Sequence, residues 1–333
     1  MSVKAIRRIL AAVKDPHGHE LAALGKAAQL ARQLQAELVL YHAITEPLYV
    51  ERDSSSRLPI DLIEKSRTEA TRAMLEHVAA RLRSLDTRVA ISVNWDYPTY
   101  EAVIRAARRL EADLVMVDCA RASHPARWFL HFTDWELLRH SPVPVLLMKT
   151  TEPYRAAPVL AAVDAGHSYG KPEQLDRDIL EYGAGLAAAL SGPLHAVYAY
   201  NPIPALAARE LVVPEAVAEA EREAYAQACT LVEPLFETAG VAAENRHVRE
   251  GFTIDVIDEV AQGVGAQVVV IGAIARSGIK GIVIGNTAER MLDRLSCDLL
   301  IVKPADFRGQ VPATPRGMHV ARPGVRSAPT GFY

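Results

Sequence analysis

This sequence of 333 residues has few cysteines, a small net charge and few long apolar runs. The three cysteines, Cys119, Cys229 and Cys297, are far apart and show no CxxC or Cys/His spacing, which argues against a zinc site or a disulfide framework. The formal net charge is −3, so no excess of positive charge indicates nucleic acid or an anionic membrane as a partner. No apolar window approaches a membrane-spanning length, and the N-terminal run ends at Lys14, too early for a secretory signal. We therefore expect a cytoplasmic protein that binds neither nucleic acid nor a membrane.

An internal repeat is the main feature that the sequence does contain. Half of the residues are hydrophobic, and a chain of this length exceeds one typical core, so two domains are expected. Each half has an apolar run followed by an acid, a later apolar run, and a third run that ends in lysine. The matching pairs are residues 9–13 with 159–163, 114–117 with 268–271, and 145–149 with 299–303.

The domain boundary falls near the proline-containing stretch 150–158. We predict an N-terminal domain at residues 1–150 and a C-terminal domain at residues 151–305. Residues 306–333 are rich in proline, glycine and arginine and have no apolar period, so we predict a disordered tail. RNA binding by this basic tail is an alternative, which its few interleaved aromatic residues disfavour.

The pattern within each repeat predicts an α/β fold. Short runs of Val, Ile and Leu without polar alternation indicate strands that are buried on both faces of a sheet. Helical stretches separate these strands, including residues 59–85 and 214–239, and the third strand of the second repeat is predicted at residues 242–248. Strand and helix in alternation predict a doubly wound parallel sheet, whose ligands bind at the carboxyl ends of the strands.

A glycine-rich loop in the second repeat is the strongest functional signal. The loop follows the buried strand 268–271 and leads into an amphipathic helix. Glycine lets the backbone approach a ligand, and the N–H groups and dipole of the helix favour an anion such as phosphate. Asn286, with Glu289 three residues later, also fits a plain helix cap, and both readings can hold at once. The candidate binding residues in this region are Ile271, Gly272, Gly278, Gly285, Asn286 and Thr287.

Several motifs together resemble the universal stress proteins, in particular the tandem members of the E type, over roughly residues 4–305. The GNTAE run at residues 285–289 and the TDWELLR run at residues 133–139 are both similar to E-type sequences. Nucleotide-binding copies in that family carry the pattern G-x2-G-x9-G-[ST]. Here the first and third glycines are Gly272 and Gly285, while Ala275 stands at the middle glycine and Asn286 at the serine.

The resemblance carries expectations about ligands and assembly. It implies a stress-response regulator whose C-terminal domain binds adenine nucleotide, with ATP and Mg²⁺ as cofactors and unidentified proteins as partners. The adenine and ribose contacts would be Val163, Asp164 and Ala199, although a strand-end Asp can also be a solvated cap. It further implies two five-stranded domains that pair through their fifth strands, residues 143–148 and 299–302, as an intrachain pseudo-dimer. Whether two chains also form a homodimer is left open.

The N-terminal repeat departs from the nucleotide pattern. Asp118 replaces Gly272 and His131 replaces Gly285, and a carboxylate would repel phosphate. The aromatic side chains in residues 128–135 either fill the core or line a site for an apolar ligand. The alternative function is therefore a scaffold for protein interaction, or a binder of an apolar small molecule through the N-terminal domain.

Motifs for catalysis are not found. The sequence contains no GxSxG, no HExxH and no P-loop lysine, and Asp164 is the one residue singled out as a general base. We expect no enzyme beyond slow hydrolysis of ATP.

Overall fold

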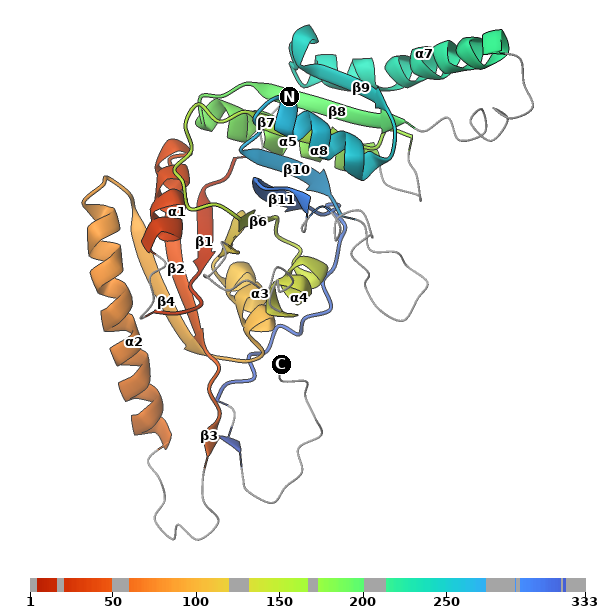
Figure 1. Cartoon of the computed structure of the whole chain (residues 1–333). Coiled ribbons are helices and arrows are strands. Elements are labelled where there is room, and N and C mark those ends of the chain that lie inside the picture. Colours follow the sequence, from red (N-terminus) through yellow and green to blue (C-terminus); the bar gives the residue numbers. More distant parts are fainter. Residues whose placement is uncertain are drawn as a thin grey trace. The chain divides into compact units, whose positions relative to one another are not determined.

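The chain forms two compact units in the computed structural model (Figure 1). The N-terminal unit comprises residues 6–145 and 308–333, and the C-terminal unit comprises residues 1–5 and 146–307. The structure describes the residues in the ranges 5–16, 21–49, 60–119, 132–166, 173–200, 214–273, 291, 294–318 and 320–321.

The N-terminal unit is built on a parallel sheet with the strand order β4-β2-β1-β5. Helices α1 and α2 contact each other, as do α3 and α4, and Figure 1 shows the two pairs on opposite sides of the sheet. The elements are β1 Arg8–Ala12, α1 Leu21–Gln33, β2 Glu37–Ile44, β3 Leu48–Tyr49, α2 Ile60–Arg83, β4 Val89–Trp95, α3 Thr99–Arg109, β5 Leu114–Asp118, α4 Phe132–His140 and β12 Val320–Ala321.

The C-terminal unit repeats this plan with the strand order β6-β11-β10-β7-β8-β9, although Val145 of β6 is counted with the other unit. Helix α5 contacts β7, β8, β10 and β11, whereas α8 contacts β8 and β9. The elements are β6 Val145–Met148, β7 Val159–Val163, α5 Glu173–Ala189, β8 Leu194–Tyr200, α7 Pro214–Thr238, a 3₁₀ turn η1 Ala243–Asn245, β9 Arg246–Glu250, α8 Thr253–Gly263, β10 Val268–Gly272 and β11 Asp298–Val302.

The apolar runs behave as predicted, because they form the inner strands. Every residue of β7 and β11 is buried, as are most of β1, β5 and β10. The predicted α/β class with parallel sheets and flanking helices is thus confirmed. The prediction of five strands in each domain is not confirmed. Strand β6 was expected as the fifth strand of the N-terminal domain, but it stands beside β11 in the strand order.

One strand boundary was predicted incorrectly. We expected a strand over residues 242–248, whereas residues 243–245 form the 3₁₀ turn and β9 runs from Arg246 to Glu250. Strand β9 is the last in the order and is only partly buried, so its sequence need not be apolar. The apolar residues before it had suggested an earlier start.

The linker between the repeats is fixed to β11 by Asp298, whose side chain is fully buried. Its carboxylate accepts hydrogen bonds from the backbone N–H of Lys149 at 2.9 Å and from the hydroxyl of Tyr154 at 2.6 Å. Burial, together with the charge of Asp298, raises the pKa of Tyr154 well above its ordinary value, so Tyr154 remains a donor. Residues 149–154 therefore pack as part of the C-terminal unit.

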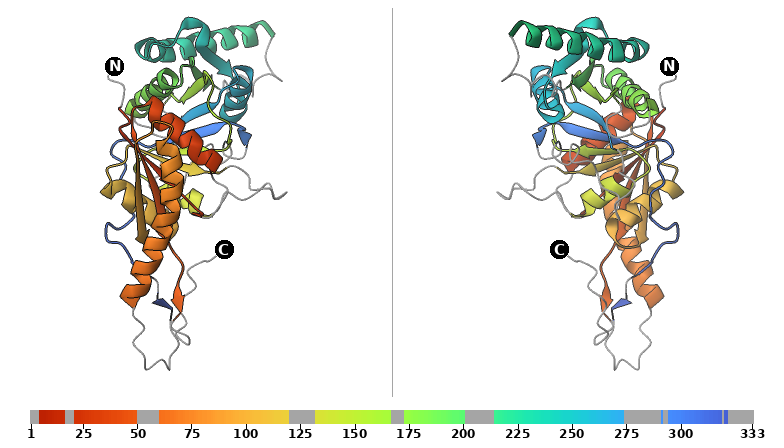
Figure 2. Two further views of the ribbon diagram at one scale, coloured as in Figure 1. Left: turned by 90° about the vertical axis from the view of Figure 1, so that its left-hand side faces the viewer. Right: turned by 90° about the vertical axis from the view of Figure 1, so that its right-hand side faces the viewer.

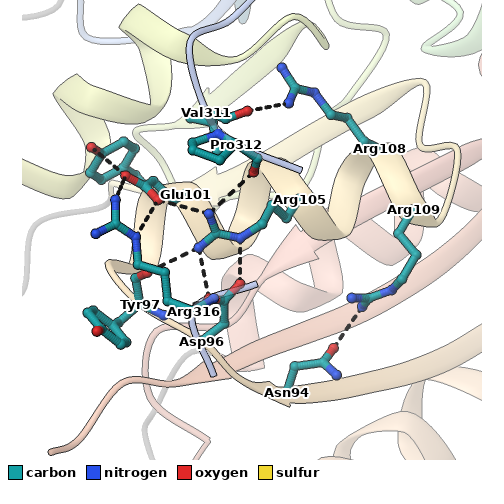
Figure 3. Close-up of polar contacts among 11 residues, drawn as sticks. Asn94, Asp96, Tyr97, Glu101, Arg105, Arg108, Arg109, Val311, Pro312 and Arg316 are labelled. Carbon is teal, nitrogen blue, oxygen red and sulfur yellow. Dashed lines mark hydrogen bonds and ion pairs between the residues drawn. The ribbon is translucent and has the colours of Figure 1, made fainter. Parts of the chain in front are cut away.

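Residues 308–318, which we name the C-terminal strap, lie against α3 of the N-terminal unit (Figure 3). The Arg316 guanidinium donates to both carboxylate oxygens of Glu101, at 2.7 and 3.0 Å, and its backbone N–H donates to Asp96 at 2.9 Å. The Arg108 guanidinium donates to the Val311 carbonyl at 2.8 Å. We expected disorder from residue 306 onward, whereas residues 311 and 316 of the strap make these specific contacts; residues 319 and 322–333 lie outside the described ranges.

A buried charge cluster receives the strap. Asp96, Glu101 and Arg105 are each no more than 5% exposed. Arg105 donates two hydrogen bonds to the Asp96 carboxylate, at 2.7 and 2.8 Å, and one to Glu101 at 2.8 Å. Because a buried charge is costly unless it is paired, Arg316 supplies the second cation that the two carboxylates require.

After the strap, β12 pairs in parallel with β3, so these two short strands lie side by side in the views of Figure 2. Within the described ranges, no helix is both long and apolar enough to cross a membrane.

Candidate functional site

Strand register shows which residues of the two repeats correspond. Ala12 of β1 pairs with Val117 of β5, and Ala162 of β7 pairs with Ile271 of β10. Lys14 lies two residues after Ala12, and Asp164 lies two residues after Ala162. Asp118 follows Val117 directly, and Gly272 follows Ile271 directly. The two repeats therefore place different chemistry on the same backbone positions.

In the C-terminal unit, the predicted residues meet where the strand order reverses. Strands β8 and β9 lie on one side of β7, and β10 and β11 lie on the other. Ligands of doubly wound sheets bind outside the strand ends at such a point. The structure brings Val163, Asp164, Ile271 and Gly272 together at these ends, with Val163 and Ile271 buried and Asp164 half-buried. Ala199, also half-buried, lies on the neighbouring β8.

Asp164 is held in place by a second acid. The backbone N–H of Asp164 donates to the carboxylate of Asp176 on α5 at 2.9 Å, and Asp176 is 1% exposed. Burial, then the charges of Asp164 and Asp176, raise the pKa of Tyr198 on β8. Two carboxylates therefore lie near this strand end, and carboxylates accept hydrogen bonds from the hydroxyl or amine donors of a ligand.

Gly272 has a packing role that the sequence did not indicate. A β-carbon at this position would lie 2.9 Å from the Leu175 side chain and 3.0 Å from that of Ile179, both on α5. The absence of a side chain therefore lets α5 pack closely against the end of β10. The spacing of Leu175 and Ile179, one helical turn apart, was the available signal. Gly278, Gly285, Asn286 and Thr287 lie outside the described residues, as does Ala275.

In the N-terminal unit, an ion pair occupies the corresponding strand end. The register puts Lys14, rather than the acid Asp15 that follows it, at the position of Asp164. The Lys14 ammonium donates to the Asp118 carbonyl at 2.8 Å and to the Asp134 carboxylate at 3.0 Å. Burial opposes the charge of Lys14, but Asp134 and its neighbours outweigh burial, so the pKa of Lys14 is raised.

Sequence reasoning missed the pairing of Lys14 with Asp134. Asp134 was noted as part of the TDWELLR run, but nothing in its spacing indicated a partner so far away in the chain. Asp134 is 1% exposed, and burial of Cys119 beside it raises the pKa of that thiol, so Cys119 stays protonated. This strand end contains a fixed cation and a fixed anion, where the C-terminal unit has a carboxylate and a glycine.

Two repeats with matched registers and strand-end sites define a tandem protein of the doubly wound α/β class. The model of the "Universal stress protein family" matches residues 5–149 and 158–303, and the chain belongs to that family. The family resemblance inferred from the sequence is thus confirmed, including its tandem arrangement.

Curated relatives and solved structures agree with this assignment. The chain is 34% identical to a universal stress protein E homolog of Haemophilus influenzae over 52% of its own length, and this match spans 56% of that relative. It is 27% identical to universal stress protein E of Photorhabdus laumondii over 91% of its length and 97% of that protein. A solved structure from Pseudomonas aeruginosa PAO1, described as functionally unknown, is 28% identical with a TM-score of 0.66, covering 92% of this chain and 95% of that one.

Proposed function

We propose that this stress-response protein binds an adenine nucleotide, ATP with Mg²⁺, at the strand ends of its C-terminal unit, and that it acts in the cytoplasm. The observation that supports the proposal best is the placement of Asp164 beside the end of β10, at the point where the strand order reverses. Tandem domains of this family give the proposal its context.

The described residues suit the nucleoside part of such a ligand. The Asp164 carboxylate can accept hydrogen bonds from ribose hydroxyls or from the adenine amine. The hydrogen bond from its backbone N–H to Asp176 fixes the position of the residue. The buried Val163 and Ile271 offer an apolar wall beside it. The carboxylates of Asp164 and Asp176 favour a cation with the phosphates, which is the contribution that Mg²⁺ would make.

The phosphate part of the proposal rests on the sequence. Gly272 and Gly285 keep the family spacing, and Asn286 and Thr287 follow at the start of a helical stretch. Gly272 itself is explained by packing against α5. We therefore assign phosphate contact to Gly278, Gly285, Asn286 and Thr287, and leave Gly272 as the residue that positions the end of β10.

Calorimetric titration of the nucleotide-stripped full chain with ATP and Mg²⁺ tests the proposal. We expect one site per chain. Asp164→Ala should weaken binding about tenfold, because a hydrogen bond to a charged group contributes about 1.5–3 kcal/mol. The matched control is Lys14→Ala at the corresponding position of the other repeat, which should leave ATP affinity unchanged.

A second variant separates the loop from the strand end. Gly285→Asp places a carboxylate where phosphate is proposed and should abolish binding in a folded protein. Absence of heat at millimolar ATP in the wild type would show the nucleotide assignment to be wrong. Equal affinity in the wild type, Asp164→Ala and Gly285→Asp would move the nucleotide site elsewhere.

A further inference from the structure

The N-terminal unit contains a cavity of about 700 Å³ at the carboxyl ends of its strands. Its volume lies in the range of small-molecule sites, which is roughly 300–1,000 Å³. Apolar side chains line much of it, from the sheet and from α2, α3 and α4. They include Val13, Ile44, Met74, Val103, Val117 and Leu137.

Both basic side chains that the structure describes around this cavity are paired with acids. Three acids, Asp15, Glu46 and Asp134, line it together with two bases, Lys14 and Arg67. Lys14 is paired with Asp134, and Arg67 with Glu46, so each base is already balanced by an acid. Such a lining disfavours an anion and accepts a neutral molecule.

The Lys14–Asp134 pair gives the apolar cavity a specific polar point. Among the described residues, Asp134 Oδ1 is buried with no hydrogen-bond partner, while Oδ2 accepts from Lys14. The Lys14 ammonium has three donors, and two of them go to Asp118 and Asp134. A buried acceptor without a partner costs about 1–3 kcal/mol. A ligand group that both donates and accepts would satisfy Asp134 and Lys14 together.

We propose that this cavity is a second ligand site, which binds a neutral, largely apolar small molecule through one hydroxyl or carboxamide group at Lys14 and Asp134. The donor of that group goes to the Asp134 carboxylate, and its oxygen accepts from Lys14. The site is separate from the nucleotide site proposed above, because Lys14 and Asp118 replace Asp164 and Gly272 at the corresponding positions. It also sharpens the expectation of an apolar ligand, since a pure hydrocarbon leaves Asp134 Oδ1 without a partner.

Three probes of nearly equal shape test the proposed chemistry on the full chain. Naphthalene-2-carboxamide has the required donor and acceptor, naphthalene-2-carboxylate has a negative charge, and naphthalene has neither. Binding is measured by ligand-observed NMR and by titration of naphthalene fluorescence. We expect the carboxamide to bind at least about tenfold more tightly than either of the other two, which corresponds to the loss of a hydrogen bond to a charged group.

Two variants and one control assign the binding to this cavity. Ala70→Trp fills the cavity from an exposed position on α2, so it should block the carboxamide without disturbing the core. Asp134→Asn should weaken the carboxamide and strengthen the carboxylate, because it removes the negative charge at the polar point. Asp15→Asn makes the same chemical change at an exposed acid of the cavity and should leave the preference for the carboxamide intact.

The order of affinities remains decisive even if Asp134→Asn folds poorly, because it is measured on the wild type and on Ala70→Trp. Equal binding of carboxamide and naphthalene would reduce the site to an apolar cavity and overturn the polar assignment. Undiminished binding to Ala70→Trp, or no carboxamide binding up to its solubility limit, would overturn the site itself. Displacement of the carboxamide by saturating ATP and Mg²⁺ would show one shared site rather than two.

Discussion

The two repeats of this universal stress protein share one strand register but differ in charge at the strand ends. The C-terminal unit has Asp164 and Gly272 there, and the N-terminal unit has Lys14 and Asp118. In the C-terminal unit the backbone of Asp164 donates to Asp176, whereas in the N-terminal unit Lys14 donates to Asp134 and to the Asp118 carbonyl. The comparison shows that a shared strand arrangement does not determine the chemistry of the strand ends. That chemistry depends on a few side chains at the point where the strand order reverses.

The repeats also differ at the helix that follows the third strand. In the N-terminal unit, α3 begins at the buried cluster of Asp96, Glu101 and Arg105, which the C-terminal strap completes. In the C-terminal unit, α8 carries Asp255 and Asp258, and their partner Arg294 is 48% exposed. The helix after the third strand thus has an anchor whose arginine is buried in one repeat, and in the other it has a cluster whose arginine is about half exposed.

The largest effect is expected from removing the cation of the buried anchor. Arg105→Leu leaves two buried carboxylates with only Arg316, and breaking a buried pair in this way costs about 3–5 kcal/mol of unfolding free energy. Equilibrium unfolding in urea measures the change. The matched variant, Arg294→Leu, should change stability less, because Arg294 and Asp255 are both about half exposed and solvent screens their pairing. Similar losses in the two variants would contradict the distinction between the two helices.

A smaller effect is expected from the strap. Arg316→Ala should lower the unfolding free energy by about 1–2 kcal/mol, since it removes a charge-assisted pair of hydrogen bonds that is partly screened by solvent. Arg308→Ala, an exposed position of the same segment, is the control and should be nearly neutral. Hydrogen exchange of the α3 amides gives a second readout. Unchanged protection of α3 in Arg316→Ala would show that the strap does not stabilise it.

The smallest effect concerns pH and the C-terminal unit alone. His195 on β8 and His247 on β9 lie 3.2 Å apart between ring nitrogens, and the corresponding residues of the N-terminal unit are Val39 and Ser92. Burial lowers the pKa of both histidines, and for His247 the charges of His195 and Arg249 lower it further.

The sign follows from proton linkage. Below the ordinary histidine pKa of about 6.5, the unfolded chain takes up protons before the folded one does, so stability falls as pH decreases. We expect the urea midpoint of the wild type to drop below that pH. The double variant His195→Val with His247→Ser, which installs the N-terminal counterparts, should drop less. An identical pH profile in both proteins would exclude this pair as the cause.

Much of the architecture could be predicted from local sequence. The apolar runs 159–163 and 268–271 became adjacent buried strands, and Asp164 lies at the strand end where it was expected. Such features are readable because burial on both faces of a parallel sheet requires continuous apolar residues. The start of β9 was misjudged because an edge strand has no such requirement.

The side-chain partnerships could not be predicted in the same way. Lys14 pairs with Asp134, and Arg316 pairs with Glu101, although the partners are far apart in the sequence. No periodic pattern in the sequence indicates either pair. The strap was expected to be disordered for a related reason. An extended segment held by arginine side chains and backbone carbonyls needs no apolar period, so its composition alone resembles that of an unbound tail.

The sequence by itself determined that this chain is a tandem pair of doubly wound domains, because hydrophobic burial acts on patterns that are repeated along the chain. Only the tertiary structure decided that Lys14 pairs with Asp134, that Gly272 makes room for α5, and that Arg316 completes the buried cluster of the N-terminal unit. These outcomes depend on which distant groups come within a few ångströms of one another. Register and packing determine that proximity after the strands have formed.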